Sequence, residues 1–260
     1  MMRIHSLERL RKLGDVVRQR GPASAARLAA EAVIMEFDAE WIRRSRDRRF
    51  DAKHRVTTGG FLPLEELEGL TNEQVENSHN YRGTPVALFD EALRDLHLRH
   101  QEYEFVDYGS GMGKALLLAA RYPFKRVTGV EFSQELHEAA ERNIAGWRLH
   151  DQRCGDVRSV LADASTWPLP QGNCVLYFFN PFREALMRTV LASIVEQARA
   201  GGREIYILYV HPSFPGVFEE FSELRQVARV RLLKPLYDIY RIEPEVPVKI
   251  VGEESLPLSV

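Results

Sequence analysis

Glycines at alternate positions, with an acid in front of them, form the stretch of this sequence best suited to holding a ligand. Gly109, Gly111 and Gly113 alternate in DYGSGMGK, and Asp107 lies two residues before the first of them. A second acid, Glu131, ends the stretch VTGVE. Glycine lets a ligand approach the backbone closely, and a carboxylate offers two acceptor oxygens on one rigid group. These residues predict a site that binds hydroxyl or ammonium groups.

The glycine spacing disfavours a dinucleotide. A dinucleotide fingerprint has its third glycine five residues after the first, against the pyrophosphate, and Lys114 occupies that position. S-Adenosylmethionine fits better, because it carries an amino-acid end, a sulfonium and an adenosine but no phosphate. The turn 109–113, with Ser110, would face the methionine end. Asp107 would hold the ammonium, directly or through water, and Glu131 would accept both ribose hydroxyls.

A strand, a crossover helix and a second strand position these residues. Phe105-Val106 and the valines of 127–130 suit buried parallel strands, and 114–122 is rich in helix-forming Ala and Leu. Such a right-handed unit binds its ligand at the carboxyl ends of the strands. Further strands are expected at 157–162, 174–179, 204–210, 224–232 and 237–242. We therefore predict an α/β fold with a seven-stranded, doubly wound, Rossmann-like sheet.

DYGSGMGKALLLAA followed by VTGVEFS resembles the first two motifs of the class I S-adenosylmethionine-dependent methyltransferases. It is especially similar to the branch of the non-SET-domain lysine methyltransferases and related bacterial proteins of unassigned substrate. The resemblance covers residues 81–243 and implies an S-adenosylmethionine-binding methyltransferase domain there, whose last strand is antiparallel. Residues 1–80 would form an N-terminal helical extension and loop, and residues 244–260 a C-terminal tail.

Five more residues are candidate cofactor contacts. In the resembling family, a tyrosine and a threonine before the helix that leads into the first strand lie near the methionine end; here they are Tyr81 and Thr84. Phe132 would lie against the adenine ring. Asp163 can accept from the adenine amino group, while a backbone amide at Ala164 meets a ring nitrogen. The alternatives are ordinary packing for the two aromatic residues, a helix cap for Thr84 and a capping or turn role for Asp163.

Asn180, Pro181 and Phe182 follow the apolar strand CVLYFF and are the predicted catalytic residues. Methyl transfer is an in-line displacement, so the nucleophile must arrive opposite the sulfur with a free lone pair. The Asn180 amide oxygen and a carbonyl held by Pro181 can accept N–H bonds from an amine, and Phe182 would exclude water. Such positioning supplies roughly 7–11 kcal/mol in well-oriented intramolecular reactions. The alternative is an Asn-Pro turn without a catalytic role.

This motif resembles the Asn/Asp-Pro-aromatic motif of amino-methylating enzymes and the Asn-containing aromatic motif of the non-SET lysine enzymes. It has one proline where the nucleic-acid adenine type usually has two. We therefore expect an enzyme that methylates an amine, such as a lysine side chain of a protein. A small-molecule N- or O-methyltransferase and a non-catalytic S-adenosylmethionine-binding protein are the alternatives, and an NAD-binding protein is a distant third.

The sequence does not identify the general base. A lysine amine, with a pKa near 10.4, must be neutral to attack, and an apolar pocket would favour its neutral form. His211, after the fifth strand, is a possible proton acceptor or substrate contact, and its alternative is a structural role.

Charge is unevenly distributed along the chain. The net charge is −2, but residues 1–56 hold 14 Lys and Arg against 8 Asp and Glu, and the remainder holds 21 against 29. The small net charge makes nucleic acid an unlikely partner. The run RRSRDRRF at 43–50 is either a solvated helix end or a site for an acidic partner or lipid surface. The sequence does not specify an oligomeric state.

The head of the chain is expected to be helical. One helix would span residues 4–20 and end at Gly21-Pro22, and a second would span residues 23 to about 46. The second would bury some combination of Leu28, Ala32, Ile34, Phe37 and Trp41.

Two cysteines, Cys154 and Cys174, cannot build a zinc cluster, so no metal site is expected. Cys174 lies in an apolar run and is predicted to be a buried thiol. No run reaches the roughly 18 apolar residues of a membrane helix, and the N-terminus lacks a signal-peptide core. We therefore expect a cytoplasmic protein.

Overall fold

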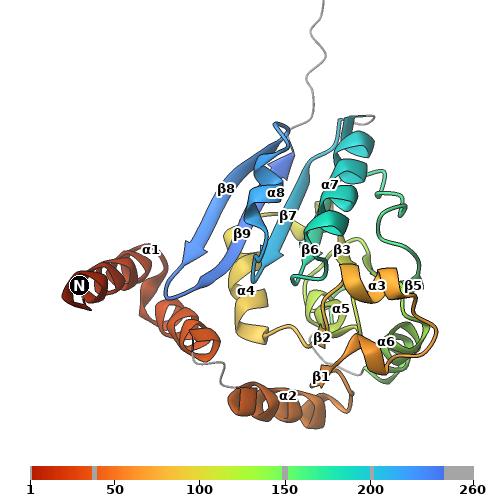
Figure 1. Ribbon diagram of the computed structural model, residues 1–260, viewed down its shortest axis with the longest axis horizontal. Coiled ribbons are helices and arrows are strands. Elements are labelled where there is room, and N and C mark those ends of the chain that lie inside the picture. Colours follow the sequence, from red (N-terminus) through yellow and green to blue (C-terminus); the bar gives the residue numbers. More distant parts are fainter. Residues whose placement is uncertain (1, 37–39, 148–151, 200–201, 243–260) are drawn as a thin grey trace, which may run out of the picture.

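The computed structural model describes residues 2–36, 40–147, 152–199 and 202–242. It centres on one seven-stranded sheet with the strand order β5-β4-β3-β6-β7-β9-β8 (Figure 1). The strands are β3 (Glu104–Tyr108), β4 (Val127–Glu131), β5 (Val157–Leu161), β6 (Cys174–Phe178), β7 (Ile205–Val210), β8 (Leu224–Arg231) and β9 (Pro235–Ile242). Strands β3 to β7 pair in parallel, and β9 runs antiparallel to both of its neighbours. The predicted doubly wound sheet is confirmed.

Helices cover both faces of this sheet. One face carries the second half of α1 (Met2–Glu36), α4 (Val86–Asp95) and α5 (Lys114–Ala119). The other carries α7 (Glu184–Arg199) and α8 (Pro215–Glu219). Helix α6 (Gln134–Gly146) packs along β4 and β5. A short 3-10 turn, η2 (His100–Glu102), leads into β3.

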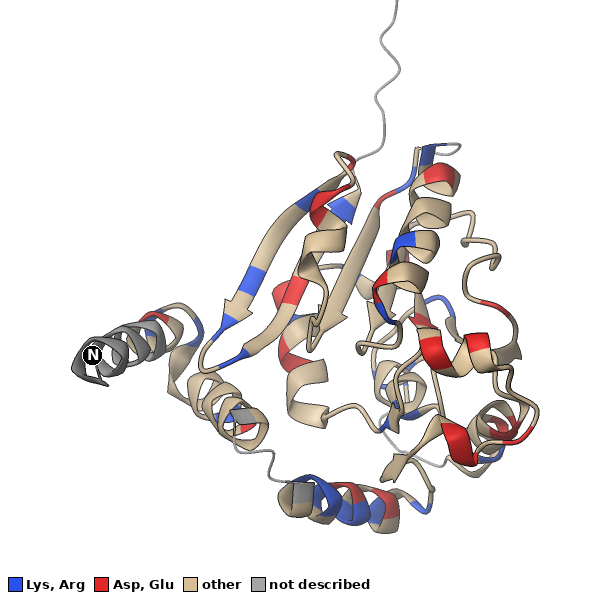
Figure 2. Cartoon of the chain, in the orientation of Figure 1, with Lys and Arg blue, Asp and Glu red and all other residues tan. Residues whose placement is uncertain are grey.

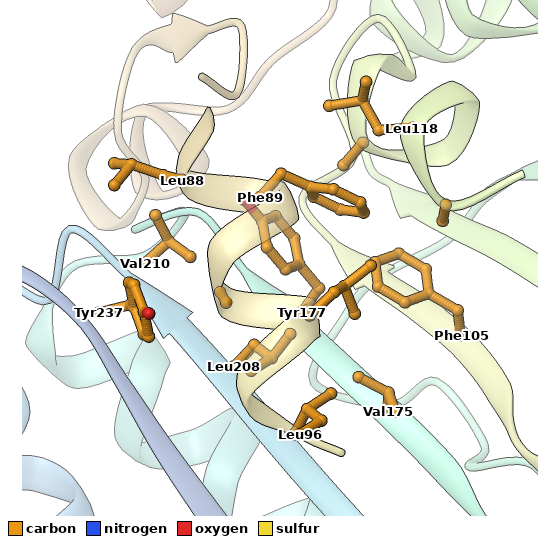
Figure 3. Packing of buried hydrophobic residues seen from close by; sticks show 14 of the residues in the cluster. Leu88, Phe89, Leu96, Phe105, Leu118, Val175, Tyr177, Leu208, Val210 and Tyr237 are labelled. Atoms are coloured by element: carbon orange, nitrogen blue, oxygen red, sulfur yellow. The ribbon is translucent and has the colours of Figure 1, made fainter. Parts of the chain in front are cut away.

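The core under α4 is aromatic (Figure 3). Phe89 is fully buried, with its ring centroid 5.8 Å from that of Phe105 and 5.3 Å from that of Tyr177. Leu208 and Val210 of β7 complete the layer. Burying a phenylalanine contributes about 1.5–3 kcal/mol, so this cluster fixes α4 on the strands whose carboxyl ends carry the predicted site.

The N-terminal helices differ in part from the prediction. Helix α1 kinks at Gly21 (φ 77°), as the Gly21-Pro22 pair predicts. Leu28, Ala32 and Ile34 are buried as expected, whereas Phe37 lies outside the described residues. Trp41 is not part of the buried combination, because it is 74% exposed.

Trp41 belongs to a separate helix, α2 (Glu40–His54), which continues beyond the predicted end. Its inward side carries Asp47, whose carboxylate pairs with buried Lys114, and Asp51, which bonds to the loop that follows. Because two acids hold this side, hydrophobic periodicity could not reveal the helix.

Residues 57–83, here called the cap segment, lie between α2 and α4. They contain a hairpin of β1 (Phe61–Leu62) and β2 (Tyr81–Arg82), with η1 (Leu64–Glu66) and α3 (Asn72–Asn77) between its strands. The hairpin links the two sides of the boundary predicted at residue 81. Backbone bonds from the His79 N–H to the Pro181 carbonyl (3.0 Å) and from the Arg183 N–H to the Asn77 carbonyl (2.8 Å) hold the segment over the end of β6.

Two predictions concern features beyond the sheet. The proposed C-terminal tail, residues 244–260, lies outside the described residues. Within the described part of the chain, no helix is both long enough and apolar enough to cross a bilayer.

Candidate active site

A cavity of about 270 Å³ lies at the carboxyl ends of the central strands, beneath the cap segment. Its wall brings together predicted residues from four separate stretches: Tyr81; Gly109 and Gly111; Glu131 and Phe132; and Asn180, Pro181 and Phe182. His211 also lines it. The predicted cofactor turn and the predicted catalytic motif therefore share one space.

The glycine turn is closed on both sides by these neighbours. Gly109 and Gly111 have φ values of +76° and +53°, which side chains rarely adopt. A Cβ atom on Gly109 would lie 2.6 Å from the Pro181 Cβ, and one on Gly111 would lie 2.2 Å from the Tyr81 ring. Glycine is thus required here for packing as well as for ligand approach.

Glu131 holds the turn from the next strand. One carboxylate oxygen accepts the Gly111 N–H at 2.8 Å, and the other accepts the Ser133 N–H at 2.9 Å. Burial raises the pKa of Glu131, and these two N–H groups oppose the rise. A carboxylate oxygen has more than one lone pair, so both oxygens can still accept from a ligand.

Asp107 faces a second, smaller space behind Gly109. This cavity measures about 20 Å³ and is shared with Tyr81, Thr84 and Ser110; such a volume holds about one water molecule. Burial, reinforced by the charge of Glu131, raises the pKa of Asp107 well above its usual range. A cation arriving here would stabilise its ionised form.

Thr84 and Ser110 fit this smaller space in different ways. The Thr84 hydroxyl lies 3.0 Å from the Tyr177 hydroxyl. The helix-cap alternative for Thr84 is wrong, since Pro85 stands at the cap of α4. The Ser110 hydroxyl is buried without a hydrogen-bond partner among the described residues.

Gly113 and the residue after it lie outside the main cavity. Gly113 stands at the N-cap of α5 with φ +81°, and a Cβ there would lie 3.1 Å from that of Ala140. Lys114, where a dinucleotide fingerprint needs glycine, is 2% exposed and pairs with Asp47. Its side chain is therefore held in an ion pair with α2.

Asp163 and Ala164 also lie outside this cavity. Asp163 is exposed, and one of its oxygens accepts from both the N–H and the hydroxyl of Ser165, each at 2.7 Å. These bonds form a turn, which is the alternative role predicted for Asp163. Contact of either residue with adenine stays a prediction.

The predicted catalytic motif is oriented from β7. Asn180 adopts a positive φ of 46°, a conformation that asparagine tolerates better than most residues. Its amide oxygen accepts from the Tyr209 hydroxyl at 3.0 Å. That hydroxyl in turn accepts the N–H groups of Ser213 and Phe214 at 3.1 and 3.2 Å. Burial raises the pKa of Tyr209 to about 12, so the phenol stays protonated and keeps donating to Asn180.

Sequence reasoning missed most of the contribution of the cap segment. Phe61, Ser78, His79 and Arg82 line the cavity. The sequence feature that could indicate these residues is the polar run SHNYRGT directly before α4, in which only Tyr81 and Thr84 are predicted site residues. The run has no hydrophobic period, so composition alone could not place it over the strands.

Two neutral imidazoles face this cavity. The Nε2 atoms of His79 and His211 are buried and have no partner in the described part of the chain. Burial, followed by the charge of Arg183 and then Arg82, lowers the pKa of His79. Burial, with Arg43 and Arg82 nearby, lowers the pKa of His211 to about 3. Both rings are therefore uncharged at neutral pH and free to bond to a ligand.

The described residues contain no group of three or more His, Cys, Asp or Glu side chains placed to hold a metal ion. Cys154 and Cys174 are both free and buried. The prediction for the Cys174 thiol is confirmed, and burial raises its pKa to about 12.

Comparison with known proteins relates one stretch of the chain to a known family. Residues 105–202 match a family model described as a methyltransferase domain, and that stretch holds the glycine turn, Glu131 and Asn180. Together with the strand order of the sheet, the match over this stretch, which is less than half of the chain, indicates a Rossmann-like methyltransferase fold. The match to a methyltransferase domain indicates that the protein is an enzyme.

Two solved structures illustrate the similarity. An RNA methyltransferase from Salinibacter ruber in complex with S-adenosyl-L-homocysteine is 17% identical, with 65% of this chain and 99% of that chain covered at a TM-score of 0.46. Magnesium protoporphyrin IX methyltransferase from Synechocystis PCC 6803 with bound S-adenosylmethionine is 11% identical, with 61% and 76% covered at a TM-score of 0.41. A search of curated proteins found no match to this chain.

Proposed function

We propose that this enzyme methylates an amine, such as the lysine side chain of a protein, in the cavity between the glycine turn and Asn180. One observation supports the proposal above all others. The wall that carries Gly109, Gly111 and Glu131 also carries Asn180 and Phe182. A ligand held by the first group therefore lies next to the second.

On the cofactor side, the residues fit a sulfonium nucleoside. S-Adenosylmethionine supplies an electrophilic methyl group on sulfur when bound. Gly109 and Gly111 leave the backbone open to the methionine end, and both oxygens of Glu131 can accept ribose hydroxyls. Asp107 would meet the ammonium directly or through one water in the small cavity. Phe132 lines the wall where an adenine ring can lie.

On the acceptor side, Asn180 is held in one orientation. Because Tyr209 occupies one lone pair of its amide oxygen, the other remains for an N–H of the incoming amine. Phe182 is 2% exposed and closes this end of the cavity to water. Holding the amine in line with the methyl group is the main contribution to rate that these residues make.

The surroundings also favour a neutral amine. The imidazoles of His79 and His211 carry no charge at neutral pH, and Arg82 adds a positive charge to the wall. Low polarity and a nearby cation both disfavour an ammonium ion. A lysine amine entering the cavity would therefore lose its proton more readily than in water, which frees the lone pair for attack.

The test is incubation with labelled S-adenosylmethionine and an extract from a strain that lacks this gene. We expect the label in the protein fraction, and Asn180→Ala should abolish labelling while leaving S-adenosylhomocysteine affinity intact. Label confined to small molecules would favour the small-molecule alternative. Cofactor affinity without any turnover would favour a non-catalytic binder, and intact turnover in Asn180→Ala would contradict the assigned acceptor site.

A further inference from the structure

Helix α2 carries several cationic residues that the catalytic site leaves unexplained (Figure 2). Arg44, Arg48, Arg49 and Lys53 are exposed, and Trp41 shows 74% of its surface to solvent. Trp41, Arg44 and Arg48 are spaced at i, i+3 and i+7, so they share one stripe of the helix. Arg44 and Arg48 of this stripe lie next to residues of the cap segment.

A groove of about 270 Å³ runs between this stripe and the cap segment. Its lining, here called the α2 groove, consists of Arg44, Asp47, Arg48, Asp51, Gly59, Gly60 and Phe61. Phe61 also lines the active-site cavity, and the Arg82 guanidinium lies 5.1 Å from its ring centroid. The groove therefore leads to the mouth of the catalytic cavity, with a cation at each end of the path.

The two acids of the groove already have partners within the protein. Asp47 pairs with buried Lys114 at 2.5 Å. Asp51 accepts the N–H groups of Thr58 and Gly59 at 2.9 and 2.8 Å. By contrast, the described residues offer Arg48 no ion-pair partner, whereas Arg46, on the same helix, pairs with Glu31. An incoming anion would therefore meet the arginine side of the groove.

We propose that the α2 groove binds an acidic segment of the polypeptide whose amine is methylated. This inference rests on the proposed function, in which the acceptor is a protein. An extended acidic chain in the groove would pass Phe61 and deliver a neighbouring residue to the catalytic cavity. Charge complementarity at the rim of a binding site increases the association rate and selects among partners.

The charge distribution favours a peptide over nucleic acid. Proteins that bind duplex DNA commonly neutralise about 6–10 phosphates, which needs a broad basic surface. Outside residues 1–56, this chain carries 21 basic against 29 acidic residues, so a long nucleic acid would meet net repulsion away from α2. A membrane surface fits less well, because Trp41 is the only large apolar side chain that α2 exposes within its described residues.

Trp41 supplies a direct measurement on the full-length protein. Trp147 is 4% exposed and Trp167 is half-buried, so quenching of fluorescence by acrylamide reports chiefly on Trp41. We would titrate with poly-L-glutamate, a single-stranded oligonucleotide and phosphatidylserine vesicles. Poly-L-glutamate should protect Trp41 from quenching in a salt-sensitive manner, and Arg44→Ser/Arg48→Ser should weaken its binding at least 10-fold. Arg48→Glu alone should weaken it as well.

The matched control is Lys125→Ser/Arg231→Ser, which removes the same charge from exposed sites outside the groove. Equal weakening in this control, or no binding of poly-L-glutamate, would overturn the proposal. Tighter binding of the oligonucleotide or vesicles through Arg44 and Arg48 would overturn it in favour of those partners.

Binding here is measured without turnover, so it is separable from the proposed chemistry. Loss of S-adenosylmethionine turnover on proteins with intact poly-L-glutamate binding would count against the methyl-transfer proposal alone. Conversely, if the Arg44→Ser/Arg48→Ser variant methylated extract proteins with an unchanged KM, the result would count against the groove proposal alone. S-Adenosylhomocysteine affinity should be unchanged in both double variants.

Discussion

At the scale of single residues, Glu131 illustrates how one side chain can hold the fold and still offer acceptors to a ligand. Its two oxygens hold the backbone of Gly111 and Ser133, so the turn is already in its binding shape before a ligand arrives. Preorganisation of this kind reduces the entropy lost on binding. Asp107 differs from Glu131. Burial raises its pKa, and in the proposed site its carboxylate would gain a charged partner only from the ligand.

Replacing Asp107 by asparagine should therefore weaken cofactor binding and change its pH dependence. The loss of a charge-assisted contact, about 1.5–3 kcal/mol, corresponds to about 10- to 150-fold in the Kd for S-adenosylhomocysteine. In the wild type, affinity should rise with pH as the elevated pKa of Asp107 is passed, since the ammonium needs the carboxylate. Calorimetric titration at several pH values measures both effects.

The variant should bind with a flatter pH profile, and an unchanged profile would contradict the role of Asp107. Asp163→Asn in the same titration tests the adenine contact predicted for that residue. Unchanged affinity there would leave Asp163 with its turn alone.

Tyr209→Phe should lower kcat about 10-fold and leave S-adenosylhomocysteine affinity unchanged. The substitution removes the O–H that donates to the Asn180 amide oxygen, so the amide is free to turn. A neutral hydrogen bond contributes about 1 kcal/mol, close to the 1.4 kcal/mol of a tenfold rate change. Steady-state kinetics with a labelled protein acceptor measure kcat, and an equal loss of cofactor affinity would contradict an orienting role.

At the scale of elements, α2 shows where sequence reasoning succeeds and fails. The strands of the sheet were predictable because apolar runs such as CVLYFF end at turn residues. The inner side of α2 was not, because Asp47 and Asp51 carry its contacts and only the folded chain brings Lys114 and Thr58 to them. Helix α2 thus braces the cap segment that covers the candidate site.

Asp51→Ala should loosen the cap segment. The Thr58 and Gly59 N–H groups and the Thr58 hydroxyl would lose their acceptor, and unpaired buried donors cost about 1–3 kcal/mol. For a chain of this size, a loss of about 2 kcal/mol lowers Tm by about 4–8 °C. Cofactor affinity should fall as well, because the Tyr81 hydroxyl bonds to the Thr58 carbonyl beside Gly111.

Differential scanning calorimetry with and without S-adenosylhomocysteine measures both effects. Lys53→Ala, an exposed position half a turn further along the same helix, is the matched control and should change neither quantity. A normal Tm in Asp51→Ala would show that α2 does not brace the segment.

At the scale of the whole molecule, the candidate site forms where elements far apart in sequence meet. Its cofactor side comes from one continuous βαβ unit, which is why DYGSGMGK and VTGVE predicted it. Its other residues come from the cap segment and from the ends of β6 and β7, which lie far apart in the sequence. No local pattern brings His79 and His211 to one cavity or joins Tyr209 to Asn180, so these arrangements depend on the sheet topology.

This joining of distant segments buries neutral histidines and so makes stability depend on pH. His79, His100 and His211 all have pKa values below the ordinary 6.5, chiefly through burial. Below pH 6.5 the unfolded chain takes up protons that the folded chain does not, so stability falls as the pH falls. Asp107 and Glu131, with raised pKa values, act in the opposite direction, since folding favours their protonated forms at acid pH.

Comparison with His211→Gln isolates one histidine from these opposing contributions. His211, whose pKa lies at about 3 under the influence of burial, Arg43 and Arg82, contributes nothing to the pH dependence well above pH 6.5. At pH 5 its neutral burial should cost the wild type up to about 2 kcal/mol, from 1.36 kcal/mol per pH unit below 6.5. Glutamine does not titrate, so the variant should lose less stability on acidification. Urea unfolding at pH 7 and pH 5 measures the difference, and His97→Gln, at an exposed position, is the matched control. If the wild type and His211→Gln lost equal stability between these pH values, His211 would be protonated as readily in the folded chain as in the unfolded one.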